Sequence, residues 1–314
     1  MEKVSNVKIW MAQIRANFLI LAVFLVVIGL AFSLKYPPQS GSSFNVIHAI
    51  LLIIGVVLTH ISVNLFNEYS DFKTKIDFYT KRTPFSGGSG MMTSGKTRPE
   101  NVRFVGITTL IIAALAGIYF TFVSHWIIAV ISLIGGFSVL FYTNFLAKHV
   151  LGELFAGLSL GTLVVLGTYI SMTALPGTPL KQLLPAEVIW ISIPPGILTS
   201  LLLFINQFPD VEADKQGGRR HLVIRCGIKR ASYIYAFGMF VTFGIIVLMP
   251  ILGISSPWIY IALLPLPLAV KVSMTAIRHG SDIAKMIPAL RNNIMTVLGT
   301  DLLLALAVFI EVLK

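Results

Sequence analysis

Long apolar runs are the feature that most limits what this chain can fold into. Nine of them follow one another between residues 16 and 313. An α-helix needs about 20 apolar residues to cross a bilayer, and a spanning segment can satisfy its backbone polar groups in lipid only as a helix or in a closed barrel. The pattern therefore predicts an all-α polytopic membrane protein with nine transmembrane helices, at residues 16–34, 44–69, 102–122, 125–146, 151–174, 187–208, 231–254, 257–278 and 293–313.

Composition and charge support a membrane protein and exclude a nucleic-acid-binding one. Hydrophobic residues make up 56% of the 314 residues and charged residues 12%, whereas about a quarter of a soluble domain is charged. The net charge is +11, but 21 of the 24 Lys and Arg residues fall on one side of the nine spans. The positive-inside rule then places the N-terminus in the cytoplasm and the C-terminus outside. We expect a single membrane domain over residues 1–314 whose partner is the lipid bilayer.

Two short acidic segments close two of the apolar runs. The first acidic segment is residues 64–77, with the loop 70–101, and the second is residues 206–214, with the loop 209–230. Both preceding spans run inward, so both segments are predicted at the cytoplasmic end of the bundle. A carboxylate in a membrane helix costs about 3 kcal/mol and is functional by default. The polar residues at helical spacing are Asn64, Asn67 and Asp71, followed by Asp77, in the first segment, and Asn206, Asp210 and Asp214 in the second.

The oxygen atoms of these side chains predict a magnesium site. Carboxylate and amide oxygens are hard ligands, and proteins usually hold Mg²⁺ with one or two carboxylates plus phosphate oxygens. Two facing acidic segments would hold Mg²⁺ ions bridged by a diphosphate, and Lys and Arg from the two loops would neutralise the remaining charge. An isoprenoid chain on that diphosphate would lie among the spans. The alternative is that the carboxylates pair with neighbouring cations as topology anchors.

Three stretches carry a family resemblance. NEYSDFKTKID, FYTNFLAKHVLGE and NQFPDVEADKQGGRRHLVIRCG resemble the two Asp-rich motifs and the intervening Tyr motif of the UbiA superfamily of intramembrane prenyltransferases. The RTPFSGGSG loop and the YT…LGE pattern are most similar to the 1,4-dihydroxy-2-naphthoate polyprenyltransferase branch. The resemblance implies a central cavity within the nine helices, Mg²⁺ as cofactor, and transfer of a polyprenyl chain from polyprenyl diphosphate to an aromatic acceptor, as in menaquinone biosynthesis.

The resemblance also implies roles for individual residues. The catalytic set is Asn67, Asp71, Asp210, Asp214 and Tyr142, and the metal ligands are Asn67, Asp71, Asp77, Asp210 and Asp214. Two positions depart from a common family form, because Glu68 stands where Asp is usual and Asp77 replaces an Asp at position 75. Tyr142 either steadies an allylic cation with its ring face or is an interfacial tyrosine. Candidate diphosphate partners are Arg82, Lys148, Lys215, Arg219, Arg220 and Arg225, and further pocket residues are Asn64, Asn144 and Asn206.

One motif points to a different function and is rejected. Residues 90–97, GMMTSGKT, fit the letters of a nucleotide-binding P-loop. That loop needs a buried strand before it and a helix opening at its Lys-Thr, whereas RTPFSGGS precedes this stretch and Arg98-Pro99 follows it. We therefore expect no ATP binding and interpret the region as a flexible Gly-rich lid over the diphosphate.

Several alternatives remain open on the sequence alone. The acceptor could instead be 4-hydroxybenzoate, homogentisate or a prenylated glycerol phosphate. A transporter or Mg²⁺ channel would also carry acidic residues, but the two spans concerned are polar mainly at their inner ends. His60 and Asp301 lie within spans and outside the matched motifs. Prolines at 194–195 and 265–267 are expected to kink or break their spans.

Overall fold

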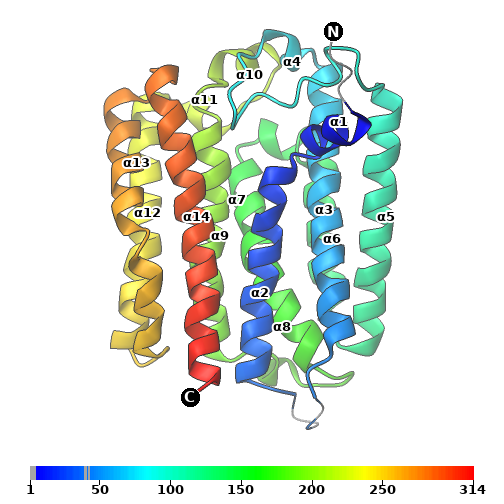
Figure 1. The fold of residues 1–314 in the computed structure, drawn as a ribbon, viewed down its shortest axis with the longest axis vertical. Helices are drawn as coiled ribbons and strands as arrows, with labels where there is room; N and C mark the ends of the chain where they lie inside the picture. Colours follow the sequence, from blue (N-terminus) through cyan, green and yellow to red (C-terminus); the bar gives the residue numbers. More distant parts are fainter. Residues whose placement is uncertain (1–4, 39–40, 42) are drawn as a thin grey trace.

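The computed structural model describes residues 5–38, 41 and 43–314, and all regular structure within this part of the chain is helical. Long helices stand side by side, and short helices and loops gather at one end of them (Figure 1). Among these described residues seven helices are long and apolar enough to cross a membrane, so the protein is a multi-pass membrane protein. They are η1 with α2 (Ala16–Lys35), α3 (Val46–Lys73), α5 (Pro99–Val123), α7 to α8 (Gly152–Thr173), α9 (Ala186–Asn206), α12 (Ile228–Ile251) and α14 (Ile283–Val312).

The two other predicted spans take less regular forms. The 3₁₀-helix η5 (Pro257–Leu263) and α13 (Leu266–His279) pass as one span only together, and they are bent by 41° at their junction. Pro265 lies at this junction, so the predicted break is confirmed. The helix α6 (Ile127–Phe141) is apolar but shorter than the others. The count of nine spans therefore stays a prediction. In α9 the chain continues through Pro194 and Pro195 without a break.

The last span begins ten residues earlier than predicted. The expected start was residue 293, whereas α14 starts at Ile283, after Asp282, whose side chain accepts a hydrogen bond from the Lys285 N–H (3.3 Å). Such a capping bond fixes the start of a helix whatever its hydropathy. The first turns carry Lys285 and Arg291, so an apolar-run criterion cannot detect them.

The apolar side chains divide between a lipid-facing surface and a core. The core joins α2, α9, α12 and α14. The outer faces of α5 and α12 carry large exposed apolar side chains, as a bilayer requires: Phe104, Ile111, Leu115, Ile118 and Phe122 on α5, and Phe237, Phe240 and Ile251 on α12.

Glycines permit one very close helix contact within the core. The segment η3 (Gly157–Thr162) is a π-helical turn between α7 (Gly152–Ala156) and α8 (Leu163–Thr173). A Cβ added to Gly157 would lie 2.5 Å from the Gly196 carbonyl oxygen, and one added to Gly161 would lie 2.5 Å from the Gly196 Cα. Only glycine fits at these positions.

An ionic network closes the bundle at the end that carries the C-terminus. The Lys35 ammonium donates to both carboxylate oxygens of Glu187 (2.8 and 2.7 Å) and to Glu311. The Tyr36 hydroxyl donates to Glu187 at 2.6 Å. We call these four residues the far-end network. It joins the ends of α2, α9 and α14, and every carboxylate in it has a cationic partner.

The opposite end of the bundle, at the top of Figure 1, holds the short helices. The helix α1 (Asn6–Gln13) lies across this end, and α4 (Ile76–Tyr79) lies beside α10 (Val211–Gln216). Gly217 makes that contact close, because a Cβ there would overlap the Ile76 side chain. The other short elements at this end are α11 (Leu222–Cys226) and η2 (Leu146–Lys148), whereas η4 (Leu180–Gln182) precedes α9 at the far end. Both acidic segments lie at this end, which we call the site end.

Candidate active site

The two acidic segments meet at the guanidinium of Arg219. Asp71 lies in the last turns of α3 and accepts from Arg219 Nη2, while Asp214 in α10 accepts from Nη1 at 3.0 Å. The Arg219 backbone N–H also donates to the Asp214 carbonyl (2.9 Å), through a turn in which Gly218 has φ +80°. That left-handed conformation favours glycine. Two carboxylates, predicted to converge but far apart in sequence, thus share one partly buried cation.

His221 occupies the second oxygen of Asp214. Its Nε2 lies 3.0 Å from Asp214 Oδ2, and its Nδ1 accepts from the Ile224 N–H at the start of α11 (3.4 Å). Because Nδ1 is the acceptor, Nε2 carries the proton and donates to the carboxylate. Asp214 is therefore held from both sides, by Arg219 and by His221.

Asp77 and Asp210 belong to no ion pair in the described part of the chain. Burial, followed by the charges of Asp71 and Glu68, raises the pKa of Asp77 to about 7. Burial and then the charge of Asp214 raise the pKa of Asp210 to about 7. The Oδ1 atom of Asp210 is buried without a hydrogen-bond partner. The site thus holds more negative charge than Arg219 balances, and an added cation would relieve the excess.

The Gly-rich loop between α4 and α5 packs directly on the first acidic segment. The backbone N–H and hydroxyl of Ser89 both donate to Glu68, the hydroxyl at 2.7 Å, and Gln13 of α1 donates to the same carboxylate at 2.5 Å. Gly88 has φ +72°, and a Cβ there would lie 2.8 Å from Asp77 Oδ1. The loop therefore covers the carboxylates, in the place expected for a lid. No strand precedes residues 90–97 among the described residues, and the next helix opens only at Pro99.

The residues after α6 form a third side of the site. The Thr143 hydroxyl donates to Asn67 Oδ1 at 2.6 Å, which links the first acidic segment to this turn. Next to it the Tyr142 ring packs within 3.3 Å of the position that a Cβ on Gly152 would take. Burial raises the pKa of Tyr142, and the charges of Arg219 and Asp214 act on it as well. Tyr142 thus lies beside the acidic segments and stays un-ionised.

A comparison with known proteins identifies the family. The UbiA prenyltransferase family matches residues 22–294, which is most of the chain. This chain belongs to the UbiA family. Its similar proteins include the 1,4-dihydroxy-2-naphthoate octaprenyltransferases of Bacillus subtilis, 28% identical over 83% of this chain and 80% of the relative, and of Escherichia coli, 24% identical over 99% and 98%.

Solved structures of UbiA homologues share the fold. The apo form of a homologue from Aeropyrum pernix K1 aligns over 94% of this chain and 98% of that one, with a TM-score of 0.69 at 16% identity. A homologue from Archaeoglobus fulgidus bound to DMAPP and Mg²⁺ aligns over 96% and 98%, with a TM-score of 0.56 at 13% identity. The chain is therefore a prenyltransferase with the UbiA fold.

The basic residues predicted to bind diphosphate occupy different environments in this prenyltransferase. Arg219 is partly buried between Asp71 and Asp214. Arg82 donates to the Thr93 hydroxyl (2.6 Å) and to the Asp77 carbonyl (3.2 Å). Lys215 pairs at the surface with Glu212. The remaining three side chains are exposed at the site end: Lys148, Arg220 and Arg225.

The three asparagines predicted to line the pocket also differ. The Asn64 amide donates to the Ile14 carbonyl at 3.0 Å and so holds the N-terminal turn. Asn206 has a buried Oδ1 without a partner, and Asn144 is exposed. Asn206 is therefore the one whose amide oxygen remains available inside the protein.

Sequence reasoning missed several residues that shape the UbiA site. Glu153 of α7 accepts from the Leu222 N–H (3.1 Å) and so positions α11. Gln13 and Arg15 reach Glu68 from the N-terminal helix, and Arg15 Nε lies 3.8 Å from it. His221 follows the second acidic segment by only seven residues, which was a usable signal. Nothing in the sequence indicated that α1 folds over the site end.

The donor set of the site fits Mg²⁺. In the described part of the chain no three acidic or histidine side chains converge closely enough to hold a metal alone. Mg²⁺ does not need such a cage, because it is bound by one or two carboxylates with phosphate oxygens and water. The unpartnered oxygen of Asp210 and the raised pKa of Asp77 are what a site short of a cation displays.

Proposed function

We propose that this UbiA-family protein transfers a polyprenyl chain from polyprenyl diphosphate to 1,4-dihydroxy-2-naphthoate, with Mg²⁺ as cofactor, in menaquinone biosynthesis. The names of the relatives support this acceptor, and the ligands of the Archaeoglobus fulgidus homologue support a prenyl diphosphate and Mg²⁺. The observation that carries the proposal is the meeting of both acidic segments at one end of an apolar bundle, around the partly buried Arg219.

The metal ligands in this proposal come from both acidic segments. Asn67, Asp71 and Asp77 would act from the first segment, and Asp210 and Asp214 from the second. Mg²⁺, when bound there with the diphosphate, neutralises the charge that builds on the leaving group. Binding it requires ionised Asp77 and Asp210, whose pKa values of about 7 place that ionisation in the neutral range.

The chain's own residues position the substrate and stabilise charge. Arg219 and Arg82 lie beside the carboxylates, so their N–H groups can donate to diphosphate oxygens. The neutral Tyr142 offers a ring face to an allylic cation as the C–O bond breaks. The loop at Gly88 and Ser89 covers the carboxylates and excludes water, which would otherwise capture the cation. The electron-rich acceptor ring then attacks, and loss of its carboxylate restores aromaticity.

The site faces the cytoplasm in this proposal. Lys and Arg concentrate in loops 70–101 and 209–230, which the structure gathers at one end, and such loops stay cytoplasmic. Cysteines introduced at Ser94 and Gln216, with the free Cys226 replaced by serine, should label from the cytoplasmic side only. Labelling of the two positions from opposite sides would disprove a shared site.

The decisive experiment identifies products by mass spectrometry. Purified protein, Mg²⁺ and a polyprenyl diphosphate are incubated with 1,4-dihydroxy-2-naphthoate, 4-hydroxybenzoate, homogentisate or a prenylated glycerol phosphate. We expect a prenylated, decarboxylated naphthalenediol and little product from the other acceptors. If the protein preferred another acceptor, the proposed prenyl-transfer reaction would stand, but the proposed acceptor would be wrong.

A further inference from the structure

A cavity of about 300 Å³ lies between the N-terminal turn and the Gly-rich loop. One wall is residues 11–18, with Met11, Arg15 and Phe18, and the other is residues 83–89, with Phe85 and Ser86. This volume is at the lower limit of small-molecule sites, which span roughly 300–1,000 Å³. The space suits a flat ring compound and is too small for a polyprenyl chain.

The second wall of this cavity is shared with the candidate active site. Gly88 and Ser89 line the cavity, and the same two residues pack on Asp77 and Glu68. Ser86 also lines it, with its hydroxyl 2.9 Å from the Thr83 hydroxyl on the same wall. A ligand in the cavity would therefore be separated from the carboxylates by one layer of residues.

Arg15 contributes a positive charge to the lining of the cavity, and neighbouring groups pair with that charge only weakly. Among the described residues its guanidinium makes no hydrogen bond, and its one ionic contact is the 3.8 Å approach to Glu68. Glu68 is already held by Gln13 and by two donors of Ser89. The guanidinium is part-exposed, at 29%, and its fixed fork of N–H donors matches a planar carboxylate.

The backbone holds Arg15 in an unfavourable conformation. Its φ of 53° is left-handed, a conformation that non-glycine residues rarely adopt. Hydrogen bonds from Arg15 N to the Ala12 carbonyl (3.0 Å) and from Phe18 N to the Arg15 carbonyl (2.9 Å) maintain it. Asn64 of α3 fixes the preceding carbonyl. The turn therefore positions Arg15 from both flanks.

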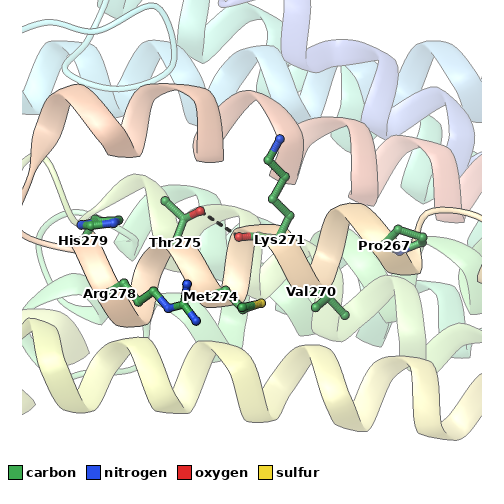
Figure 2. A pocket seen from close by; sticks show the side chains of 7 residues that line it. All are labelled: Pro267, Val270, Lys271, Met274, Thr275, Arg278 and His279. Atoms are coloured by element: carbon green, nitrogen blue, oxygen red, sulfur yellow. Dashed lines mark hydrogen bonds between the residues drawn. The ribbon is translucent and has the colours of Figure 1, made fainter.

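A second cavity, along α13, lacks these features. It measures about 340 Å³ and is lined by residues of α13, among them Lys271 and Arg278. Figure 2 shows these two side chains pointing to opposite sides of the helix, so they do not converge on one ligand. The hydroxyl of Thr275 is used internally, donating to the Lys271 carbonyl (2.8 Å). Its lining includes the imidazole of His279 but no Phe, Tyr or Trp side chain, and no residue of either acidic segment is part of that lining.

From these features we infer that the cavity at Arg15 binds the aromatic acceptor, with the Arg15 guanidinium on its carboxylate and Phe18 and Phe85 beside its rings. This inference rests on the proposed function, because it assigns a place to the acidic acceptor of that reaction. It makes Arg15 the residue that distinguishes an aromatic acid from the corresponding uncharged phenol.

The test measures acceptor binding in the absence of prenyl diphosphate. The probes are 1-hydroxy-2-naphthoate and its uncharged counterpart 1-naphthol, titrated calorimetrically into purified full-length protein. Wild type should bind the acid more tightly than the phenol by about 10- to 100-fold, the range of a charge-assisted hydrogen bond. Arg15→Gln should abolish that preference, and Arg15→Lys should restore part of it.

Two further variants separate recognition from folding. Lys8→Gln removes the same charge from the exposed face of α1, outside the cavity, and should keep the full preference. Ala12→Leu fills the cavity from an exposed helical position and should weaken naphthoate binding more than benzoate binding. Unchanged acid preference in Arg15→Gln, at a wild-type melting temperature, would overturn the inference.

Turnover measurements keep this inference distinct from the proposed function. If wild type prenylates naphthoate and Arg15→Gln has an unchanged KM for it, the function stands and the inference fails. If the acid binds through Arg15 but wild type prenylates a different acceptor, the inference stands and the proposed substrate fails.

Discussion

Charged networks occupy both ends of the bundle, and they differ in how completely their charges are paired. At the far end, Lys35 and Tyr36 satisfy Glu187, and Lys35 also reaches Glu311. At the site end one Arg219 serves two carboxylates, while Asp77 and Asp210 stay outside any described ion pair. Buried charges are normally paired because leaving them unpaired is costly. The complete network is thus expected to stabilise the fold, and the incomplete one to bind a cation.

Removal of divalent metal should have the largest effect. With EDTA in excess, prenyl transfer should fall to background, because the proposed mechanism relies on Mg²⁺ to neutralise the departing diphosphate. Added Mg²⁺ should restore it. Product formation by mass spectrometry measures both states. Full turnover in EDTA would show that the site end needs no further cation.

Substitution of single carboxylates at the site end should come next. Asp71→Asn and Asp210→Asn each keep shape and remove one negative charge, and each should cost roughly 10²–10³ in kcat, as loss of an oxyanion-stabilising group does. The double variant should lose less than the product of the two, because the groups act as a unit.

Asp301→Asn is the control for these variants. Asp301 is fully buried in α14, outside both segments, and its two oxygens have no described partner. Its replacement should cost far less activity. Greater damage from Asp301→Asn than from Asp71→Asn would move the functional carboxylate into the middle of the bundle and favour a transport pathway.

Breaking the far-end network should reduce stability and spare activity. Lys35→Met leaves Glu187 and Glu311 without their cation and should destabilise the protein by on the order of 2 kcal/mol, less than a fully buried pair because Lys35 is one-fifth exposed. The melting temperature in detergent should drop, while kcat per folded molecule stays within about twofold, as for any group remote from the chemistry. Lys181→Met, an exposed lysine on the same side, should change neither. If Lys35→Met instead lost much of its kcat at an unchanged melting temperature, the far-end network would serve activity and not stability.

A further expected effect is a dependence of stability on pH. Asp77 and Asp210 have folded pKa values of about 7, above the usual 3.8. Between about pH 4 and pH 7 the folded protein binds more protons than the unfolded chain, so its stability should fall as pH rises through that window. The metal-free melting temperature should decrease from pH 5 to pH 7, less steeply in Asp77→Asn or with Mg²⁺. An increase over this range would contradict unpaired carboxylates.

The sequence predicted those parts of the site that local spacing determines. The four-residue separation of Asn67 and Asp71 places them on one face of a helix. Their span and the span that precedes Asp210 cross the membrane in the same direction, so both acidic segments lie at the same end. Arg15 and Gln13 could not be found in this way, because their role depends on how α1 folds back over α3. Asn64, predicted to line the pocket, instead uses its amide to hold that fold.

The fold was predictable where hydropathy and helix formation coincide. The apolar runs located the spans, and Pro265 marked the break between η5 and α13. The first turns of α14 are polar, so hydropathy did not predict them. The capping residue Asp282 is the local signal that a helix begins there. The π-helical turn at Gly157–Thr162 was also missed.

The glycine contact between η3 and α9 limits how this enzyme could be re-engineered. Because Gly157 and Gly161 approach Gly196 with no room for a methyl group, the spacing of these two helices is fixed by backbone against backbone. Substitutions cannot widen the bundle gradually along that seam, since any side chain there pushes the helices apart at once. A variant designed to accept a longer prenyl chain must therefore gain its space from helices on the other side of the bundle.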